Sequence, residues 1–483
     1  MRGKLWIRVT YTCRWGILGL STMELRYPRQ VWGGMRTVLR AYLSFRHAAI
    51  AAGLALAAPL PASAAASDAA SDAALHAALA EQASGELRAF YAHRDQPLWI
   101  GADGRLGHAA AELVRLIETA DADGLDPHAL RVDELAAAVS AAQHDRSPAV
   151  LARAELALSA ALAGYAEAMM REAAGGEMLY EHDVLRPIRP EALTVLRSAA
   201  EARSLESFVA EMGWMHPLYG QVRGELAAEP ADPTLRRAAI ASLERIKAIP
   251  AAPWSRHVLI DIASARLWMY EGGRPVDSMR IVVGKADTPT PMMAGYLRYA
   301  VLNPYWNVPE NLVRQTIARN VLNQGVGYLK ARGYEVLSGW EDDAEQLDPA
   351  KIDWRAVARG ERQVVVRQKP SATNAMGSVK YEFPNPEGIF LHDTPDKALL
   401  LADARQFSNG CVRLEDAERL GRWLLGGAIP VAGADPERRI DLAQPVPIYI
   451  TYLTVRSEDG RLALGTDPYG RDATGRSTLA RVH

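Results

Sequence analysis

Apolar residues recur at helical spacing through the first half of the chain. Leu113, Leu116 and Ile117 lie three to four positions apart, which places them on one face of a helix. The segment Gly124-Leu125-Asp126-Pro127 follows, and a glycine just ahead of a proline is a typical helix end. The same pattern continues at residues 151–165, 221–227 and 236–249. It predicts a helical domain over residues 65–245.

Short apolar runs separated by turns replace this pattern after Trp254. Residues 257–262 and 267–270 form two such runs, and Glu271-Gly272-Gly273-Arg274 separates the second from a third run at 279–283. Runs of this length joined by glycine-rich turns are typical of β-hairpins. Later runs lie at residues 296–303, 364–367, 389–391 and 447–453.

This second pattern predicts a mixed, β-rich domain over residues 254–456, followed by a tail at 457–483. A longer segment interrupts the domain between about 309 and 375 and includes a predicted helix at 311–321. We interpret this segment as an inserted lid or subdomain. The expected fold class is therefore α+β, with the helical domain preceding the β-rich one.

Residues 35–64 have the features of a signal peptide. Arg36, Arg40 and Arg46 are basic, and an apolar stretch of 13 residues follows at 48–60. The small residues Ala62-Ser63-Ala64 suit signal peptidase, and the stretch is shorter than the about 20 residues of a membrane span. We expect export with cleavage after about Ala64; an uncleaved N-terminal anchor is the alternative. Residues 1–34 do not fit ahead of a signal, which suggests a mis-annotated start.

Charge and cysteine content narrow the function. The 55 basic residues nearly balance the 57 acidic ones, so no nucleic-acid partner is expected. The two cysteines are Cys13 and Cys411, and cleavage after Ala64 leaves only Cys411. A single cysteine in an exported protein either pairs between molecules or is a functional thiol.

Two metal motifs are weak. Asp121-Ala-Asp123-Gly124 resembles part of a calcium loop, but Thr119 and Leu130 would then occupy the first and twelfth positions, where neither can serve. We interpret the motif as a polar helix end. Between residues 258 and 482, His392 and Cys411 are the only histidine and cysteine, too few for a zinc site. We therefore expect no metal.

The residues that point to chemistry lie between 389 and 425. Ile389-Phe-Leu-His-Asp-Thr-Pro395 is a short predicted strand that ends at His392. Sixteen residues after His392 the segment Ser408-Asn-Gly-Cys-Val-Arg413 begins, and helical spacing over 414–425 predicts a helix directly after Cys411.

This arrangement suits a thiol nucleophile, which needs a base or a lowered pKa. His392 can be the base, and the dipole of the predicted helix would favour the thiolate of Cys411. Backbone N–H groups near Asn409 and Gly410 can stabilise an oxyanion, and Arg413 can bind a carboxylate. A buried, inert cysteine beside a structural histidine is the alternative, but the joint pattern favours catalysis.

His392-Asp-Thr-Pro395 followed by Ser408-Asn-Gly-Cys-Val-Arg413 resembles the signature of the L,D-transpeptidase catalytic domain. Further segments that resemble this family are Gly284-Lys285 with Thr288-Pro-Thr-Pro291, Asn303-Pro-Tyr-Trp-Asn-Val-Pro309, Ala375–Tyr381 with Phe383-Pro-Asn385, and Asp467-Pro-Tyr-Gly-Arg-Asp472. The helical region is similar to the scaffold domain of the large, periplasmic, Gram-negative branch at Tyr91, Pro97-Leu-Trp99, Leu158-Ser159, Tyr165 and His216-Pro-Leu-Tyr219.

The resemblance implies a periplasmic acyltransferase of peptidoglycan synthesis, with a β-sandwich-like catalytic fold and no cofactor. Cys411 would attack the bond after the third residue, commonly meso-diaminopimelate, of a donor tetrapeptide stem and release D-Ala. An amine of an acceptor stem would resolve the thioester into a 3→3 cross-link. Carbapenem-type inhibitors would acylate the same thiol, and other wall-synthesis proteins are possible partners.

The resemblance also implies roles for neighbouring residues. His392 would be the base, oriented by the backbone carbonyl of Asp393. Arg413 and Ser408 would bind substrate. Trp306 is the aromatic residue that we place near the site, with packing as the equal alternative.

The chain departs from the pattern at three points. Asn409 stands where many members have His, and Phe390 stands where Tyr is frequent. Residues 225–245 are too short for the peptidoglycan-binding module that many relatives carry. Two other functions stay open: a hydrolase, either an L,D-carboxypeptidase or a murein peptidase with the same Cys411 and His392, and an inactive wall-binding protein. The insertion favours transfer, because a lid excludes water.

Overall fold

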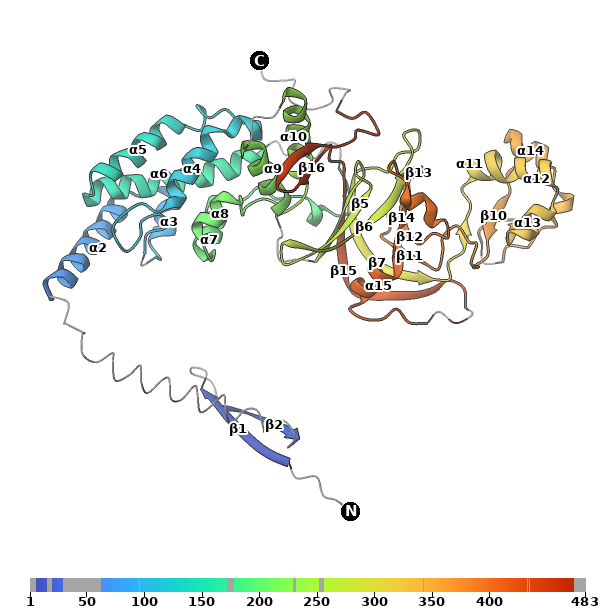
Figure 1. Cartoon of the computed structure of the whole chain (residues 1–483), viewed down its shortest axis with the longest axis horizontal. Helices are drawn as coiled ribbons and strands as arrows, with labels where there is room; N and C mark the ends of the chain where they lie inside the picture. Colours follow the sequence, from blue (N-terminus) through green and yellow to red (C-terminus); the bar gives the residue numbers. More distant parts are fainter. Residues whose placement is uncertain are drawn as a thin grey trace. The chain divides into compact units, whose positions relative to one another are not determined.

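A computed structural model describes residues 6–14, 20–28, 62–94, 96–171, 178–228, 232–251, 256–341, 343–431, 433 and 435–472. The chain divides into two compact units, Met1–Ala74 and Leu75–His483 (Figure 1). In the first unit, β1 (Trp6–Arg14) and β2 (Leu20–Pro28) pair as an antiparallel hairpin. Most of the predicted signal peptide, at 35–64, lies outside the described residues.

The second unit begins with the predicted helical domain. After α2 (Ala62–Gln82), its helices are α3 (Gly85–Tyr91), α4 (His108–Glu118), α5 (Val132–His144), α6 (Pro148–Arg171), α7 (Ala192–Glu201), α8 (Leu205–Ala210), α9 (Pro217–Ala228) and α10 (Pro233–Ile246), with short turns η2 (Ala120–Asp123) and η3 (Asp183–Leu185). The predicted helices at 151–165, 221–227 and 236–249 are confirmed, but α6, α9 and α10 each begin earlier, at a proline. Proline suits a first turn, where its missing N–H has no partner to lose.

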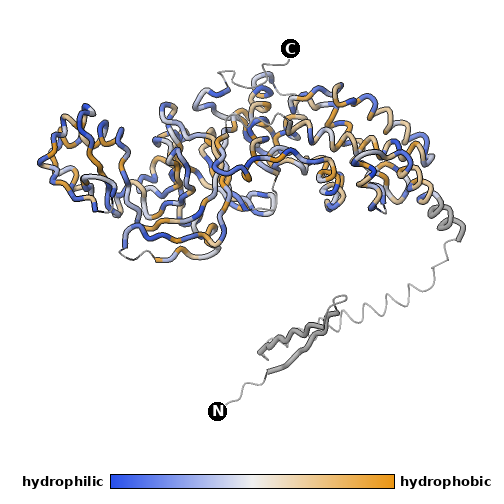
Figure 2. Tube along the Cα trace, turned by 180° about the vertical axis from the view of Figure 1, so that it is seen from behind, coloured by the Kyte–Doolittle hydropathy of each residue, from blue (hydrophilic) through white to orange (hydrophobic). Residues whose placement is uncertain are grey.

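Helix α6 is the central helix of this domain. Its segment Pro148–Met170 has the length and hydropathy of a membrane span, yet 61% of the most apolar window is buried within the protein. Leu158 and Leu162 are completely buried against the neighbouring helices. Hydrophobic and hydrophilic stretches alternate along the trace, as expected for elements with one face in a core (Figure 2).

Glu155, a buried acid on α6, fixes the loop that follows α3. Its carboxylate accepts hydrogen bonds from the Tyr91 hydroxyl at 2.7 Å, the Trp99 amide at 3.0 Å and the Leu98 amide. The indole N–H of Trp99 donates to the Ser159 hydroxyl at 2.9 Å. Burial raises the pKa of Glu155, although these donors partly oppose that rise. The aromatic residues that the sequence pattern singled out therefore surround an acid that sequence reasoning missed.

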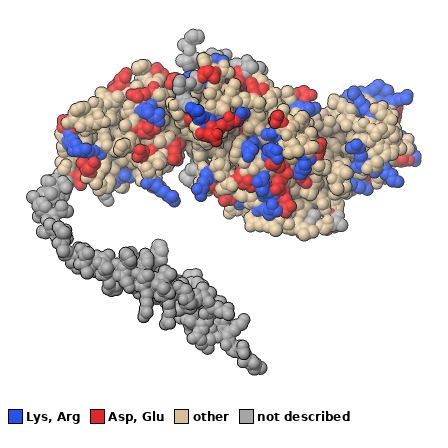
Figure 3. Space-filling view, in the orientation of Figure 1, with Lys and Arg blue, Asp and Glu red and all other residues tan. Residues whose placement is uncertain are grey.

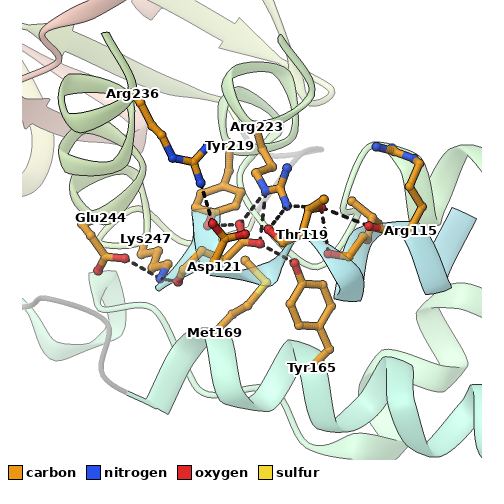
Figure 4. Close-up of polar contacts among 12 residues, drawn as sticks. Arg115, Thr119, Asp121, Tyr165, Met169, Tyr219, Arg223, Arg236, Glu244 and Lys247 are labelled. Atoms are coloured by element: carbon orange, nitrogen blue, oxygen red, sulfur yellow. Dashed lines mark hydrogen bonds and ion pairs between the residues drawn. The ribbon is translucent and has the colours of Figure 1, made fainter. Parts of the chain in front are cut away.

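Asp123 forms a second buried polar cluster in the helical domain. Its partners Tyr165, Tyr219, Arg223 and Lys247 are labelled in Figure 4. Its carboxylate accepts hydrogen bonds from the Tyr165 hydroxyl at 2.6 Å, the Tyr219 hydroxyl at 2.7 Å and Arg223 Nε at 3.0 and 3.1 Å. Lys247 Nζ donates to the Asp123 backbone carbonyl at 2.7 Å. The polar helix end inferred from the sequence is therefore an internal anchor that joins η2 to α6, α9 and the end of α10.

The β-rich domain is a sheet that closes on itself. Its strands are β3 (Leu179–Tyr180), β4 (His257–Asp261), β5 (Arg266–Glu271), β6 (Arg274–Gly284), β7 (Met293–Leu302), β11 (Val379–Glu382), β12 (Leu391–His392), β13 (Gln406–Ser408), β14 (Val412–Leu414) and β15 (Arg438–Thr451). The pairing order is β11-β12-β14-β6-β5-β4-β15-β7, and β7 also pairs with β11. Helix α15 (Ala417–Leu425) packs Leu420 and Leu424 into the same core as the strands. The predicted α+β class is confirmed.

The inserted segment has a core of its own. It contains β8 (Trp306–Asn307), α11 (Glu310–Leu312), η4 (Val313–Ala318), α12 (Arg319–Gln324), α13 (Gly327–Ala331), β9 (Tyr334–Leu337), η5 (Pro349–Lys351), α14 (Trp354–Arg359) and β10 (Val365–Gln368). The strands pair in the order β8-β10-β9. Its core contains Val336 of β9, Val366 of β10 and Ile317 of η4, which are completely or almost completely buried. The insertion is thus a packed subdomain.

The segment beyond residue 451 returns to the helical domain. It forms the hairpin β16 (Val455–Glu458) and β17 (Arg461–Leu464). Val455 lies in the core of the helical domain, and the Ser457 hydroxyl donates to Glu225 at 2.6 Å. On the face shown in Figure 3, acidic and basic side chains are interspersed over the helical and β-rich domains, whereas basic side chains predominate over the inserted subdomain at the right.

Candidate active site

Cys411 and His392 lie on neighbouring segments of the sheet. Strands β12 and β14 are parallel, with Leu391 opposite Val412 and His392 opposite Arg413. Side chains alternate between the faces of a strand, so Cys411, His392 and Arg413 share one face. Leu391 and Val412 point to the other face and are completely buried in the core. The sheet therefore presents the proposed nucleophile, base and carboxylate ligand together.

The thiol of Cys411 is in its protonated form at neutral pH. The residue is half-buried, and Sγ donates a long hydrogen bond to the Gly388 carbonyl at 3.7 Å. Burial raises the pKa of Cys411 to about 11, while the backbone of Phe390 and the charges of Arg413 and Lys380 oppose that rise. A base must therefore take the proton as the sulfur attacks.

The predicted helix does not begin directly after Cys411. Residues 412–414 form β14, which pairs with both β12 and β6, and α15 begins only at Ala417. Asp416 caps that helix by accepting from the Arg419 amide at 2.9 Å. The predicted dipole effect on the thiolate is wrong, because such an effect fades within the first turn and Cys411 precedes the cap by five residues.

His392 is buried and neutral at pH 7. Burial, and then the charge of Arg413, lower its pKa to about 4, against backbone hydrogen bonds to Asp393 and Met376. Nδ1 lies 2.6 Å from the Asp393 carbonyl, the contact expected from the sequence. On the two neighbouring strands, Lys380 of β11 and Arg413 of β14 stand opposite His392. A neutral imidazole in this position can accept a proton.

The turn before Cys411 is fixed by hydrogen bonds within it. Gly410 has φ +116°, and a Cβ there would lie 3.1 Å from Cδ1 of Ile389. The Gly410 amide donates to the Ser408 hydroxyl at 3.2 Å, and that hydroxyl donates to the Cys411 carbonyl at 2.6 Å. Ser408, which we expected to bind substrate, is buried and holds this turn by these two hydrogen bonds. Asn409 is exposed beside it.

A cavity of about 360 Å³ joins Arg413 to the inserted subdomain. Arg413 lines it from β14 and Asp396 from the loop after β12, whereas Trp306, Gln324 and Tyr328 line it from the insertion. Nε of Arg413 is buried without a hydrogen-bond partner, and burial lowers its pKa. A buried donor without a partner is costly, so the cavity suits an anionic ligand group. Trp306 and Arg413, predicted separately, therefore meet in one site.

Sequence reasoning missed a pair of charges beside the thiol. Lys380 Nζ lies 3.0 Å from Glu382 and 5.8 Å from the centre of the Phe390 ring. The charge of Glu382 raises the pKa of Cys411, and that of Lys380 lowers it. The alternating positions of Lys380 and Glu382 in 379–382 were the signal that could have placed both on the active-site face.

We expect alkylation of Cys411 to reveal the raised thiol pKa. With a pKa of about 11, on the order of one thiol in 10⁴ is ionised at pH 7, so the iodoacetamide rate should rise about tenfold per pH unit from 7 to 9.5. Peptide mass spectrometry at Cys411 measures it. In urea the same rate should level off above about pH 8.5. A plateau below pH 8 in the folded protein would instead reveal a stable thiolate.

Both domains match models of known protein families. Residues 255–448 match the L,D-transpeptidase catalytic domain, and residues 85–226 match the Scaffold domain. A Haemophilus influenzae protein named "Putative L,D-transpeptidase" is 26% identical over 286 residues, which are 57% of each chain. The chain thus spans little more than half the length of this relative.

Solved structures of L,D-transpeptidases are also similar, at low identity. One from Mycobacterium smegmatis matches 41% of this chain and 58% of its own, at 11% identity and a TM-score of 0.21. The catalytic domain of the E. faecium enzyme matches 41% of this chain and 96% of its own, at 17% identity and a TM-score of 0.17.

Proposed function

We propose that this chain, which carries an L,D-transpeptidase catalytic domain and a Scaffold domain, forms 3→3 cross-links in peptidoglycan through a thioester on Cys411. The observation that carries the proposal is the shared face of Cys411, His392 and Arg413, beside a cavity that is lined by Arg413, whose Nε is buried without a hydrogen-bond partner. A nucleophile, a neutral base and a carboxylate ligand are what acyl transfer from a peptide stem requires.

The reaction follows from the protonation states. Sγ of Cys411 attacks the carbonyl of the third stem residue while His392 takes the thiol proton. The tetrahedral intermediate collapses, His392 returns the proton to the amine of the leaving D-Ala, and a thioester remains. The amine of an acceptor stem then attacks the thioester and gives a proton to His392, which passes it back to the thiol as the new amide forms.

The spacing of Arg413 supports diaminopimelate as the third residue. Cys411 and Arg413 are two residues apart in extended chain, which separates them by about 6.6 Å. Diaminopimelate has a second amino-acid centre four carbon–carbon bonds from the one that reacts. A carbonyl held at Cys411 therefore leaves the distal carboxylate within reach of Arg413.

Transfer is favoured over hydrolysis by the inserted subdomain. It supplies most of the residues that line the cavity at Arg413, among them Trp306 and Tyr328. A stem bound in that cavity would lie against the subdomain, which would limit the access of water to the thioester. The proposal includes export to the periplasm, because residues 35–64 have signal features and peptidoglycan lies outside the cytoplasmic membrane. Donor and acceptor stems are the proposed partners, and carbapenems are the proposed inhibitors.

Muropeptide analysis tests the function. The purified protein is incubated with peptidoglycan rich in tetrapeptide stems, and the digested products are weighed by mass spectrometry. Dimers linked 3→3 are the expected result. Tripeptides without new dimers would replace the proposal by a carboxypeptidase, and unchanged muropeptides would support a wall-binding protein.

A further inference from the structure

The turn that carries Cys411 is held in place by a hydrogen bond from the side chain of Thr290. The Thr290 hydroxyl donates to the Gly410 carbonyl at 2.7 Å and accepts from the Gly284 amide at 2.9 Å. Thr290 is completely buried. A peptide unit is planar and trans, so the direction of the Gly410 carbonyl sets the direction of the Cys411 N–H on the opposite side of the same unit. Thr290 therefore fixes where that N–H points.

Tyr469 holds Thr290 in turn. Its hydroxyl donates to the Gly284 carbonyl at 2.6 Å and accepts from the Thr290 amide at 3.2 Å. The same phenol thus joins the end of β6 to the loop that follows it. At Gly284 even a Cβ would lie 2.3 Å from the Thr288 carbonyl, so the two segments are as close as their backbones allow.

The segment that carries Tyr469 is anchored on both sides. The Tyr469 ring stacks on Tyr452 at 5.5 Å, and its amide donates to the Tyr452 hydroxyl at 2.9 Å. Asp467 accepts from the Tyr452 hydroxyl and from the Asp472 amide. Arg245, on α10, donates to Asp472 at 2.7 Å. The segment 467–472 is therefore fixed to the sheet and to the last helix of the helical domain.

We propose that Tyr469 and Thr290 are positioning residues that aim the Cys411 N–H at the developing oxyanion. The inference rests on the proposed function, in which Cys411 attacks a carbonyl and an oxyanion forms. The N–H of the nucleophilic residue itself is well placed for such a role, because the oxyanion develops on the carbon that the sulfur attacks. The Gly410 amide already donates to Ser408, so the Cys411 N–H is the group of this turn that Thr290 aligns.

Two reactions of the Cys411 thiol distinguish a misdirected Cys411 N–H from a general loss of structure at the site. Acylation by a carbapenem passes through an oxyanion, whereas alkylation by iodoacetamide does not. Thr290→Val should lower the acylation rate constant at saturation by about 10- to 100-fold, with alkylation unchanged. Thr290→Ser should restore most of the rate, and Tyr469→Phe should lower it about tenfold. The half-saturating carbapenem concentration should stay within twofold.

A matched control removes a similar hydrogen bond elsewhere. Tyr180 donates from its hydroxyl to the Ala248 carbonyl at 2.6 Å, so Tyr180→Phe should leave both rates within twofold. The inference is overturned if Thr290→Val acylates at the wild-type rate, or if acylation and alkylation fall together. A wild-type protein that is alkylated but never acylated would contradict the proposed function instead.

Discussion

Replacing Cys411 by alanine should abolish both 3→3 cross-linking and acylation by a carbapenem. The thioester forms on Sγ, and no other described side chain on the shared face can replace a thiol as the attacking group. Loss of a covalent nucleophile typically costs at least about 10³-fold in rate. Muropeptide mass spectrometry and the mass of the acylated protein measure the two losses.

The variant should keep its fold. Cys411 is half-buried, and its thiol makes one long hydrogen bond, to the Gly388 carbonyl at 3.7 Å, so its removal should change the free energy of unfolding by about 1 kcal/mol or less. In the full-length chain, Cys13→Ser is the matched control, because it removes the other cysteine and should not change activity. Retained 3→3 dimers in Cys411→Ala would refute the assignment of the nucleophile.

The catalytic residues of the proposed site could be predicted from the sequence because they are close together in it. His392 and Cys411 lie in two short segments, each with a recognisable turn, and the parallel pairing of those segments brings both to one face. The residues that hold them in position could not be predicted from the sequence. Thr290 lies 120 positions from Gly410, and Tyr469 lies 185 positions from Gly284. No local sequence pattern indicates hydrogen bonds between residues so far apart, although both residues belong to segments that carry the family resemblance.

The start of α15 shows how one pattern can serve two structures. Leu414, Ala417, Leu420 and Leu424 have helical spacing, and all four are buried in the core of the sheet domain. Leu414 nevertheless belongs to β14, where it pairs with Ile281 of β6. An apolar residue at a strand end and one in the first turn of a helix look alike in sequence. The pairing of Leu414 with a distant strand makes it a strand residue. The helix therefore begins too far from Cys411 for its dipole to stabilise the thiolate.

Replacing Asp123 by alanine should destabilise the helical domain by about 3–5 kcal/mol. Arg223 is 2% exposed and would be left as a buried cation without its carboxylate. The hydroxyls of Tyr165 and Tyr219 would lose their acceptor at the same time. Urea unfolding, followed by circular dichroism of the helices, measures the loss.

A double variant tests whether Asp123 and Arg223 stabilise each other as a charge pair. Arg223→Met alone leaves a buried carboxylate, whereas Asp123→Asn with Arg223→Met removes both charges at nearly constant volume. The double variant should therefore lose clearly less stability than the sum of the losses in Asp123→Asn and Arg223→Met. Strict additivity would show that the two charges do not stabilise each other. Acylation of Cys411 at temperatures where each variant remains folded should match the wild type, because the cluster acts on the stability of the helical domain and not on the site.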